Sequence, residues 1–290
     1  MTPSAPAGLP VRRLDALRLR LLEVGSVVVA FSGGADSALL LAAAVRTLGA
    51  GRVLAATGDS ASLSRRERSA VPELAAGLGA RHVFVATGEL EVAGYRENGP
   101  TRCWFCKDEL TGRLLEVAAD AGLAHVATGT NADDLADPFR PGIRAAAGRG
   151  VVTPLADAGL TKAQVRAVSR AWSLPTWDKP ASPCLSSRIA YGLTVTRERL
   201  ARVEAAEGAL RERLRRAGID TYHLRVRDLG ERALIQVDLA AVPAVMACAE
   251  ALEAVREAGF ASVETDPRGF RSGSLNEAAS AARPHSTTED

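Results

Sequence analysis

The stretch VVVAFSGGADSALLLAAAV, residues Val27–Val45, joins two apolar runs through a pair of glycines. The run Val27–Phe31 predicts a short buried strand, and Ala38–Leu48 predicts a helix. Gly33 and Gly34 permit a tight turn and a close approach of an anion to the backbone. N–H groups at the helix start, together with the helix dipole and the hydroxyls of Ser32 and Ser37, favour a phosphate. A plain strand-to-helix turn is the alternative, but strand, Ser-Gly-Gly-x-Asp-Ser and helix occur together. The Gly-Lys-Ser/Thr ending of a P-loop is absent.

Strand-like and helix-like segments alternate through the first half of the chain. Strands are expected at Val53–Thr57, His82–Ala86 and His125–Thr128, and helices at Arg12–Glu23, Arg65–Leu78 and Glu109–Ala121. This order predicts an α/β fold with a parallel sheet and helices on both faces. Ligands of such sheets bind at the carboxyl ends of the strands. The rule places Ser32–Ser37, Gly58–Ser60, Gly88 and Gly129–Asp134 along one edge.

The second half of the chain predicts a smaller α+β domain. Thr161 and Gln164 form a capping-box pattern, so a helix is expected from Thr161 to about Trp172. Three prolines then make LPTWDKPASPCLSSR an ordered loop or linker. Helices at Thr196–Ala217 and Ala240–Ala258 and strands at Tyr222–Arg227, Ala233–Asp238 and Ser262–Thr265 follow. The expected organisation is a flexible tail (1–10), an α/β domain (11–180), a linker (181–194), the small domain (195–276) and a disordered tail (277–290).

Composition limits the class of protein. The chain has 290 residues, 47% hydrophobic and 24% charged, which is typical of a soluble globular protein. Its 36 basic residues nearly balance 34 acidic ones, so no nucleic-acid partner is expected. The first ten residues lack the apolar core of a signal peptide, and no run reaches the roughly 18 apolar residues of a membrane span. We therefore expect a cytoplasmic protein with no membrane partner.

The four cysteines suggest metal or catalytic use. Cys103 and Cys106 form a CxxC in RCWFCKDEL, which suits a redox dithiol, half of a zinc site or part of an iron–sulfur site. A zinc site usually needs four protein ligands, and the sequence has no second CxxC or HxxxH. With Cys184 there are three thiolates, and a [4Fe–4S] cluster normally takes four. Packing beside Trp104 and Phe105 is the structural alternative for the pair.

The two remaining cysteines differ from each other. Cys184 lies in the proline-rich segment near Arg188, and a nearby guanidinium favours the nucleophilic thiolate. It is therefore a catalytic candidate, against the alternative of a spare exposed thiol. Cys248 lies among the small apolar residues of AVMACAEAL, and we expect it to pack in a buried helix face.

At SGGADS the chain resembles the PP-loop ATP pyrophosphatases. The resemblance implies that the loop holds the pyrophosphate released when ATP adenylates a substrate. It implies that Ser32, Gly33, Gly34, Asp36, Ser37, Asp59, Ser60, Gly129 and Asn131 bind the nucleotide. Asp36 would also act in catalysis by holding Mg²⁺, with Asp133 and Asp134, because this hard cation prefers oxygen ligands. Charge at a helix N-terminus after Asn131 is the alternative for Asp133 and Asp134.

A longer set of motifs narrows the resemblance. SGGADS, RCWFCKDEL, TGTNADDL, RPG, GLTKAQVRAVSR, LPTWDKPASPCLSSRIAYG and GFRSGSLN occur in this order between Val27 and Asn276. Together they resemble the LarE family of ATP-dependent sulfur transferases. The resemblance implies adenylation of the carboxylates of pyridinium-3,5-biscarboxylic acid mononucleotide, a nicotinate-derived nucleotide, and their conversion to thiocarboxylates for the nickel-pincer cofactor. It also implies that Trp104, Arg188, Arg225 and Arg271 bind this anionic substrate, although each arginine has the alternative of a solvated surface residue.

Two sulfur routes follow from the resemblance. Cys103, Cys106 and Cys184 match members that hold a [4Fe–4S] cluster whose open iron carries sulfide, and this route is our prediction. The sacrificial route, in which Cys184 loses its sulfur and becomes dehydroalanine, is the alternative. Where the family tends to have an acidic residue, this chain has Gln236, which puts a metal or acid–base role there in doubt. Glu207 and Asp238 are weak candidates for such a role.

Partners and rival functions complete the prediction. A sulfide or cysteine-desulfurase source and a homo-oligomer are expected. A PP-loop tRNA thiolase is one rival, which the near-neutral charge disfavours. An ammonia-using amide ligase would not need three placed cysteines, and a nucleotide sensor would bind ATP without releasing pyrophosphate.

Overall fold

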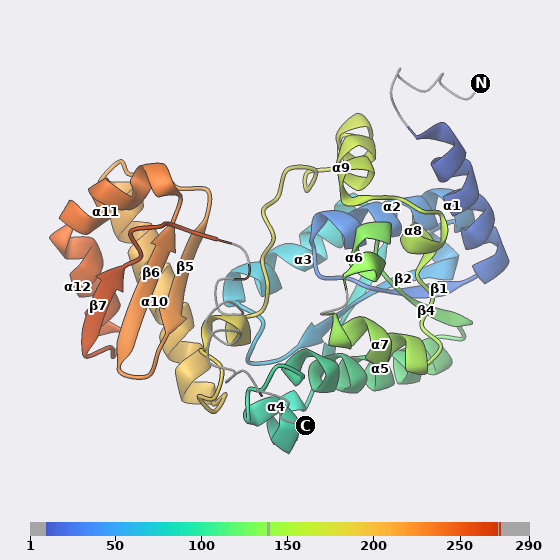
Figure 1. The fold of residues 1–290 in the computed structure, drawn as a ribbon. Coiled ribbons are helices and arrows are strands. Elements are labelled where there is room, and N and C mark those ends of the chain that lie inside the picture. The colour runs from blue at the N-terminus through green and yellow to red at the C-terminus, as the bar shows by residue number, and fades with distance from the viewer. Residues whose placement is uncertain (1–9, 138–139, 272, 274–290) are drawn as a thin grey trace, which may run out of the picture. The chain divides into compact units, whose positions relative to one another are not determined.

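A computed structural model describes residues 10–137, 140–271 and 273 (Figure 1). The chain divides into two compact units. Unit 1 runs to Tyr95 and resumes from Thr101 to Ser182, whereas unit 2 comprises Arg96–Pro100 and the described residues from Pro183 onward. These units differ from the domains predicted from the sequence, which had a separate linker at 181–194 and included Arg96–Pro100 in the first domain. The predicted tails lie outside the described residues, apart from Pro10, whose carbonyl accepts from Arg13 N–H at 2.9 Å.

Unit 1 is built on a four-stranded sheet in the order β3-β2-β1-β4. Its strands are β1 (Val27–Ala30), β2 (Val53–Asp59), β3 (Arg81–Ala86) and β4 (His125–Thr128). Every strand pair in this sheet is parallel, with Val28 opposite both Leu54 and Val126. The predicted parallel α/β sheet is therefore confirmed.

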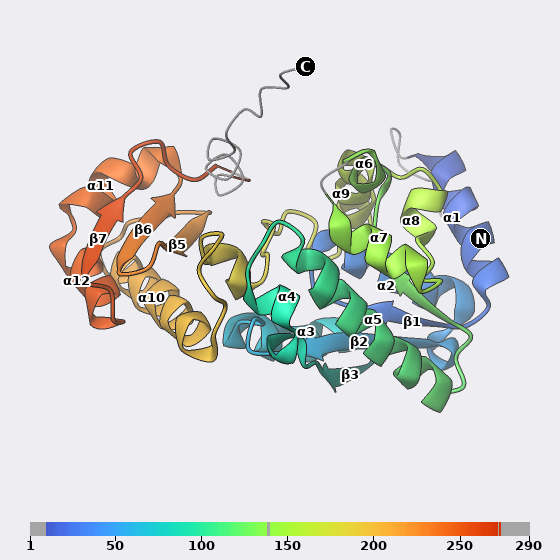
Figure 2. The same ribbon diagram turned by 60° about the horizontal axis from the view of Figure 1, so that its bottom comes forward.

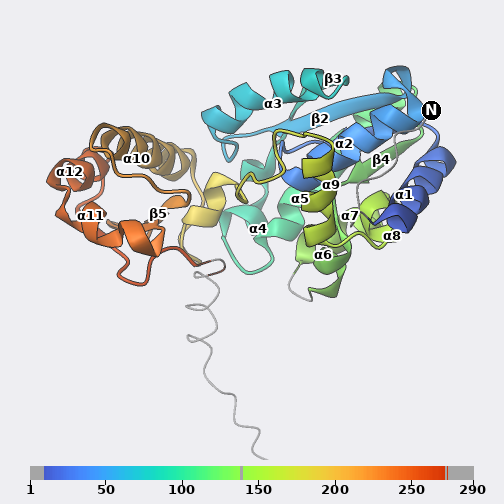
Figure 3. The same ribbon diagram turned by 90° about the horizontal axis from the view of Figure 1, so that it is seen from above.

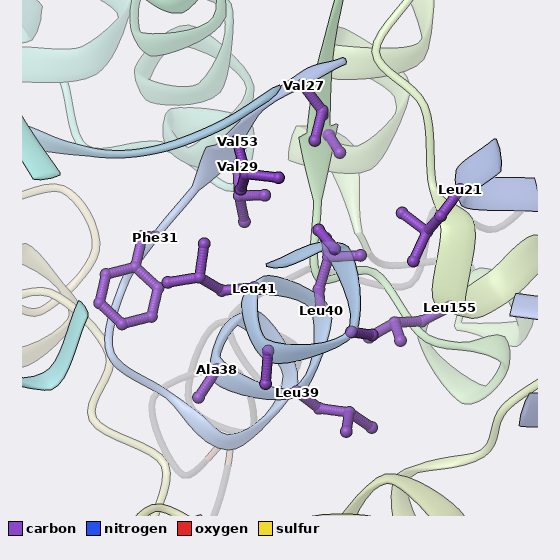
Figure 4. Close-up of a cluster of buried hydrophobic side chains, with 14 of the residues drawn as sticks. Leu21, Val27, Val29, Phe31, Ala38, Leu39, Leu40, Leu41, Val53 and Leu155 are labelled. Carbon is purple, nitrogen blue, oxygen red and sulfur yellow. The ribbon is translucent and has the colours of Figure 1, made fainter. Parts of the chain in front are cut away.

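Alternate residues of the central strand face two different cores. Val27 and Val29 point towards α1 (Val11–Val24) and α2 (Ala35–Leu48), as Figure 4 shows. Val28 points to the opposite face, where it packs with residues of α5 (Arg102–Asp120) and α7 (Pro141–Gly148) (Figure 2). A strand buried on both faces reads as a continuous apolar run, which explains why VVVA predicted it. The remaining α-helices of unit 1 are α3 (Arg65–Gly77), α4 (Ala93–Arg96), α6 (Ala132–Ala136), α8 (Pro154–Asp157) and α9 (Lys162–Ala171). The last residue of α4, Arg96, is assigned to unit 2.

Unit 2 follows the predicted α-β-β-α-β order, except that two helices occupy the place of the second predicted helix. Its sheet has the strand order β5-β6-β7, with β5 and β6 antiparallel and β6 and β7 parallel. The elements are α10 (Arg197–Arg216), β5 (Leu224–Asp228), β6 (Arg232–Val237), α11 (Val242–Ala247), α12 (Ala249–Glu257) and β7 (Ser262–Thr265). Helices α10 and α12 lie side by side (Figure 3). None of the helices in the described ranges has the length and apolar character needed to cross a membrane.

Three predicted helix boundaries were wrong. Helix α2 begins at Ala35 instead of Ala38, and α5 begins at Arg102 instead of Glu109, so Cys103 and Cys106 lie on a helix. The single helix expected at Ala240–Ala258 is broken at Cys248, whose ψ of 88° lies outside the helical region. Cys248 is therefore half-buried at a helix junction, and its predicted core position was wrong.

Candidate functional site

The glycine loop leaves β1 at the carboxyl end of the sheet. Gly33 has φ +66°, a left-handed conformation that glycine adopts without the steric cost of a Cβ. Gly34 then forms the N-cap of α2 in an extended conformation. The Ser37 hydroxyl donates to Gly34 O at 3.2 Å and accepts from Ser32 N–H at 3.3 Å. The turn is thus held by its own two serines, as the Ser-Gly-Gly-x-Asp-Ser spacing suggested.

The earlier start of α2 places Asp36 and Ser37 in its first turn. Among the described residues no side chain caps this helix N-terminus. The first N–H groups of a helix have no intrahelical acceptor, and the dipole leaves about half a positive charge there. The loop therefore presents backbone donors of the kind that bind phosphate.

Gly129 is required by close packing against the same helix start. A Cβ built on Gly129 would lie 2.8 Å from Ser37 N and 3.0 Å from Asp36 C. Gly129 follows β4, so the carboxyl ends of β1 and β4 meet here as expected. Its role in the structure is to let the backbone after β4 approach α2.

Asp36 has two partners from segments distant in the sequence. Asn131 Nδ2 donates to Asp36 Oδ1 at 3.2 Å, and Lys162 Nζ forms an ion pair with Asp36 Oδ2. Lys162 is the first residue of α9, directly after the predicted capping box of Thr161 and Gln164, which the structure confirms. The Asp36 side chain is 23% exposed and that of Lys162 is 40% exposed, so solvent and ligands reach both groups.

Asp133 and Asp134 make the contacts expected of carboxylates at a helix start. Asn131 caps α6, and Asp134 Oδ2 accepts from Asn131 N–H at 3.1 Å to complete a capping box. Arg140 forms an ion pair with Asp134 at 2.9 Å, and Asp133 Oδ2 accepts from Lys162 N–H at 2.8 Å. Across the described residues, no three His, Cys, Asp or Glu side chains are arranged to hold a metal ion. The binding of Mg²⁺ by Asp133 and Asp134 stays a prediction. Their observed contacts give both residues a structural role at the start of α6.

Lys179 also contacts the glycine loop. Its ammonium donates to Gly33 O at 3.1 Å and to Glu67 Oε2 at 2.6 Å. Arg166 of α9 fixes the segment that carries it by donating to Trp177 O at 2.8 Å and to Lys179 O at 3.0 Å. Two lysines thus supply positive charge to a loop whose own sequence has none.

Two of the residues predicted to bind the nucleotide, Asp59 and Ser60, lie at the end of the second strand. Asp59 is the last residue of β2, and its carboxylate accepts two hydrogen bonds from Arg68, at 2.8 and 2.9 Å. The guanidinium lowers the pKa of Asp59. Ser60 Oγ lies 2.8 Å from Ser62 Oγ, and Ser62 donates to the buried Glu89 at 3.2 Å. The expected nucleotide contacts of Asp59 and Ser60 stay predictions.

The cysteines divide between the two units. Cys103 is exposed and Cys106 is half-buried in the first turns of α5, at the i, i+3 spacing that puts both on one helix face. Trp104 between them is 39% exposed, so it does not fill the core. Cys184 is exposed and belongs to unit 2, immediately before the 3-10 turn Leu185–Arg188. Among the described residues, none of the four cysteines forms a disulfide.

Arg188 holds the backbone around Cys184. Its guanidinium bonds Glu207 at 2.9 and 3.3 Å and donates to Cys184 O at 2.9 Å. Pro183 O accepts a further bond from it. Arg188 is 3% exposed, and the Glu207 carboxylate also accepts from the Val226 N–H of edge strand β5. Glu207 therefore links Arg188 to strand β5, a structural role that the sequence did not indicate.

Two more arginines are buried near this ion pair. Arg225 and Arg227 alternate with the apolar residues of β5 and are 7% and 6% exposed. Burial, with Arg188 and Arg225 nearby, lowers the pKa of Arg227 to about 10 although Glu207 opposes this. Three guanidinium groups thus lie close to one another here, and such a concentration of positive charge suits an anionic ligand.

A glutamine and an aspartate complete the polar network. Arg227 Nε donates to Gln236 Oε1 at 2.9 Å, and Gln236 Nε2 donates to Asp266 Oδ2 at 2.9 Å. A carboxylate at position 236 has no N–H and could not donate to Asp266. This bond explains why a glutamine is suited to the position. Asp238 contacts His223, with 2.7 Å between Asp238 Oδ1 and His223 Nδ1. Arg271 is half-buried in the segment after β7.

Lys162, Lys179 and Arg227 were not predicted as site residues from the sequence. The sequence did contain a signal for Arg227. In the strand LRVRD it lies two residues after Arg225, so both side chains are expected on the same face of the sheet. The lysines had a compositional signal, because the whole chain contains only three, Lys107, Lys162 and Lys179, among 36 basic residues.

A parallel α/β sheet whose first strand leads through SGGADS into a helix defines a PP-loop domain. No protein-family model matches the chain. An uncharacterized protein of Synechocystis sp. is 38% identical over 267 residues, covering 91% of this chain and 97% of that relative. The pyridinium-3,5-bisthiocarboxylic acid mononucleotide synthase of Lactiplantibacillus plantarum is 33% identical over 258 residues, covering 89% of this chain and 91% of the synthase. The chain belongs to the LarE family.

Proposed function

We propose that this protein is an ATP-dependent sulfur transferase that makes thiocarboxylates on pyridinium-3,5-biscarboxylic acid mononucleotide. The proposal rests chiefly on one observation: a chain of the LarE family presents the SGGADS loop against an uncapped helix N-terminus. The Lactiplantibacillus plantarum relative is named as a pyridinium-3,5-bisthiocarboxylic acid mononucleotide synthase, and this name supplies the product class.

The loop would bind the phosphates of ATP. Backbone N–H groups at the start of α2 would receive phosphate oxygens, and the Ser32 and Ser37 hydroxyls lie beside them. Mg²⁺ prefers oxygen ligands, and the partly exposed Asp36 carboxylate suits it, while Asp133 and Asp134 position Asn131 and Lys162. Bound Mg²⁺ would neutralise charge on the phosphates.

The substrate carries one phosphate and two carboxylates. Guanidinium groups bind such anions through paired N–H donors. Arg225 and Arg227 of unit 2 are the strongest candidates because both are buried and lie close to each other, with the Arg188 guanidinium also near Arg227. Arg188 would contribute charge while its bonds to Glu207 and the Cys184 carbonyl orient the cysteine loop. Trp104 and Arg271 complete the proposed contacts.

The chemistry would proceed in two steps at each carboxylate. A carboxylate oxygen attacks the α-phosphorus of ATP, and pyrophosphate leaves into the loop. A sulfur nucleophile then attacks the acyl carbon, and AMP leaves with the electron pair of the broken C–O bond. A loop that stabilises the leaving pyrophosphate through preorganised donors accelerates the first step.

The sulfur source is proposed to involve three cysteines. Cys103 and Cys106 suit a [4Fe–4S] cluster in donor chemistry and in their spacing on α5, and Cys184 of unit 2 would be the third ligand. When bound, such a cluster would present a sulfide on its open iron. A sulfide or cysteine-desulfurase partner would replenish it.

The exposure of Cys184 favours a second route. Its sulfur would attack the adenylate to give a thioester, and a base would then remove its Cα proton while the Cβ–S bond breaks. The substrate would keep the sulfur as a thiocarboxylate, and the chain would keep a dehydroalanine.

Intact mass after turnover with ATP and substrate tests the proposal. Thiocarboxylate formation with release of pyrophosphate and AMP is expected, and absence of pyrophosphate release would contradict the function. An unchanged chain mass with iron–sulfur absorbance supports the cluster, whereas loss of the mass of H₂S supports the second route. Cys103→Ala should abolish iron binding, and unchanged iron content and turnover would contradict the cluster.

A further inference from the structure

One face of the sheet in unit 2 carries a row of basic side chains. Side chains alternate between the two faces of a strand, so His223, directly before β5, shares a face with Arg225 and Arg227. The intervening Leu224 and Val226 are buried and belong to the opposite, apolar face. Arg225 therefore lies in the middle of the row, with His223 as its neighbour on one side.

His223 is held in place by Asp238 at the end of β6. The register that pairs Leu224 with Val237 sets His223 opposite Asp238. Asp238 is ionised at neutral pH because its pKa is about 2, so its carboxylate can only accept hydrogen bonds. His223 Nδ1 therefore donates to Asp238 Oδ1 at 2.7 Å, and His223 N–H donates to Asp238 Oδ2 at 3.0 Å. These two bonds fix both the ring and the backbone of His223.

Phe270 connects this histidine to two arginines. Its ring stacks on the His223 ring, with centroids 4.4 Å apart and planes 6° apart. The guanidinium carbon of Arg225 lies over the same Phe270 ring, 5.6 Å from its centroid. Phe270 N–H donates to Val237 O at 2.7 Å, which ties the backbone just before Arg271 to β6. The ring of Phe270 thus contacts Arg225, and its backbone sets the start of the segment that carries Arg271.

An aromatic ring at this distance can orient the guanidinium of Arg225. A cation within about 6 Å of a ring centroid is attracted to the face of the ring, and the attraction is stronger when the cation is removed from water. Arg225 is 7% exposed, so little water competes with the ring. Ordering a long side chain on binding costs conformational entropy. A guanidinium that is already oriented avoids part of this cost and binds an anion more tightly.

We propose that Phe270, supported by the His223–Asp238 pair, is a positioning residue for Arg225 and Arg271 and thereby strengthens binding of the anionic nucleotide substrate. This role rests on the proposed function, in which both arginines contact that substrate, and it involves three residues that have no part in the proposed contacts. The stacked ring orients the guanidinium of Arg225, and the bond from Phe270 N–H holds the backbone before Arg271. None of the three residues needs to touch the substrate itself.

Calorimetric titration of the full chain with nicotinic acid mononucleotide is the test, because this probe carries a phosphate and one carboxylate. Phe270→Leu removes the aromatic face but keeps an apolar side chain, and it should weaken binding about five-fold or more. His223→Ala should also weaken binding, and His223→Phe, which can still stack, should recover most of that loss. Phe260→Leu is the matched control and should bind the probe as the wild type does. Its ring lies 4.2 Å from the Arg202 guanidinium carbon in the same unit, but Arg202 pairs with Asp228.

The outcomes separate the positioning role from the proposed function. Arg225→Met should weaken binding of the probe; unchanged binding in this variant, or no binding by the wild type, would overturn the proposed substrate contacts and the positioning role together. If Arg225→Met weakens binding and Phe270→Leu does not, only the positioning role is overturned. Equal losses in His223→Phe and His223→Ala would overturn stacking as the cause. Circular dichroism and urea unfolding check that each variant is folded, and if Phe270→Leu is not, the two His223 variants decide.

Discussion

Glu207→Gln should loosen unit 2 around its edge strand. The Glu207 carboxylate is 9% exposed, pairs with Arg188 and accepts from Val226 N–H at 3.2 Å. Removing one partner of a buried ion pair costs about 3–5 kcal/mol. Glutamine can keep the acceptor for Val226, so we expect the lower end, about 3 kcal/mol. At 1.4 kcal/mol per factor of ten, the opening equilibrium of β5 rises about 100-fold.

Hydrogen exchange measured by mass spectrometry on β5 peptides is the assay. The control is Glu212→Gln, which removes an exposed carboxylate from the same helix and its ion pairs with Arg215 and Arg216. Exposed pairs contribute little, so this control should exchange at nearly the wild-type rate. Inorganic phosphate should slow exchange more in Glu207→Gln, because the variant removes a carboxylate charge that lies beside Arg188 and Arg227. Wild-type exchange in Glu207→Gln would refute the reasoning.

Three further predictions concern the loop, acid stability and the core. Gly129→Ala should weaken ATP binding at least about ten-fold by calorimetry, because its Cβ would meet Ser37 N at 2.8 Å, whereas Gly148→Ala, with open space at that position, should not. Burial raises the pKa of Asp238, but bonds from His223, Thr221 and Tyr222 prevail and lower it from 3.8 to about 2. The stability this gives is complete above about pH 4 and lost as the pH falls towards about 2, so Asp238→Asn should flatten the urea-unfolding profile of unit 2 in that window. Leu40→Ala, at a fully buried position, should lower the free energy of unfolding by about 2–5 kcal/mol in urea titrations, and a change below about 1 kcal/mol would contradict the packing in Figure 4.

The sheet of unit 1 could be predicted because its central strands β1 and β2 are buried along most of their length. Runs such as VVVA carry the signal in the sequence itself, and glycines marked the turn that follows β1. Helix starts were harder. Asp36 and Ser37 favour both turns and first helical turns, and Cys103–Cys106 has aromatic and cysteine residues with modest helix propensity. Tertiary packing of α5 against the sheet decides that case.

The phosphate loop could be predicted as a local motif, but its cations could not. Lys162 and Lys179 reach the loop through the placement of α9 and the Arg166 bonds to the segment after it. Such contacts between distant segments leave no periodic pattern. The buried state of Arg188 and Arg225 was likewise hidden, because a basic residue on a strand most often faces solvent.

The short segment Arg96–Pro100 has a consequence for the order in which the protein can be assembled. Asn98 is fully buried in unit 2 and donates through Nδ2 to Ala190 O at 2.8 Å and Leu193 O at 2.9 Å. Asn98 is synthesised well before Ala190 and Leu193, so its amide is solvated until they emerge from the ribosome. Arg96–Pro100 separates the two segments of unit 1 in the sequence. Unit 2 then cannot be completed from its later residues alone. A fragment beginning at Pro183 would lack Asn98, and the carbonyls of Ala190 and Leu193 would lose their hydrogen bonds from it.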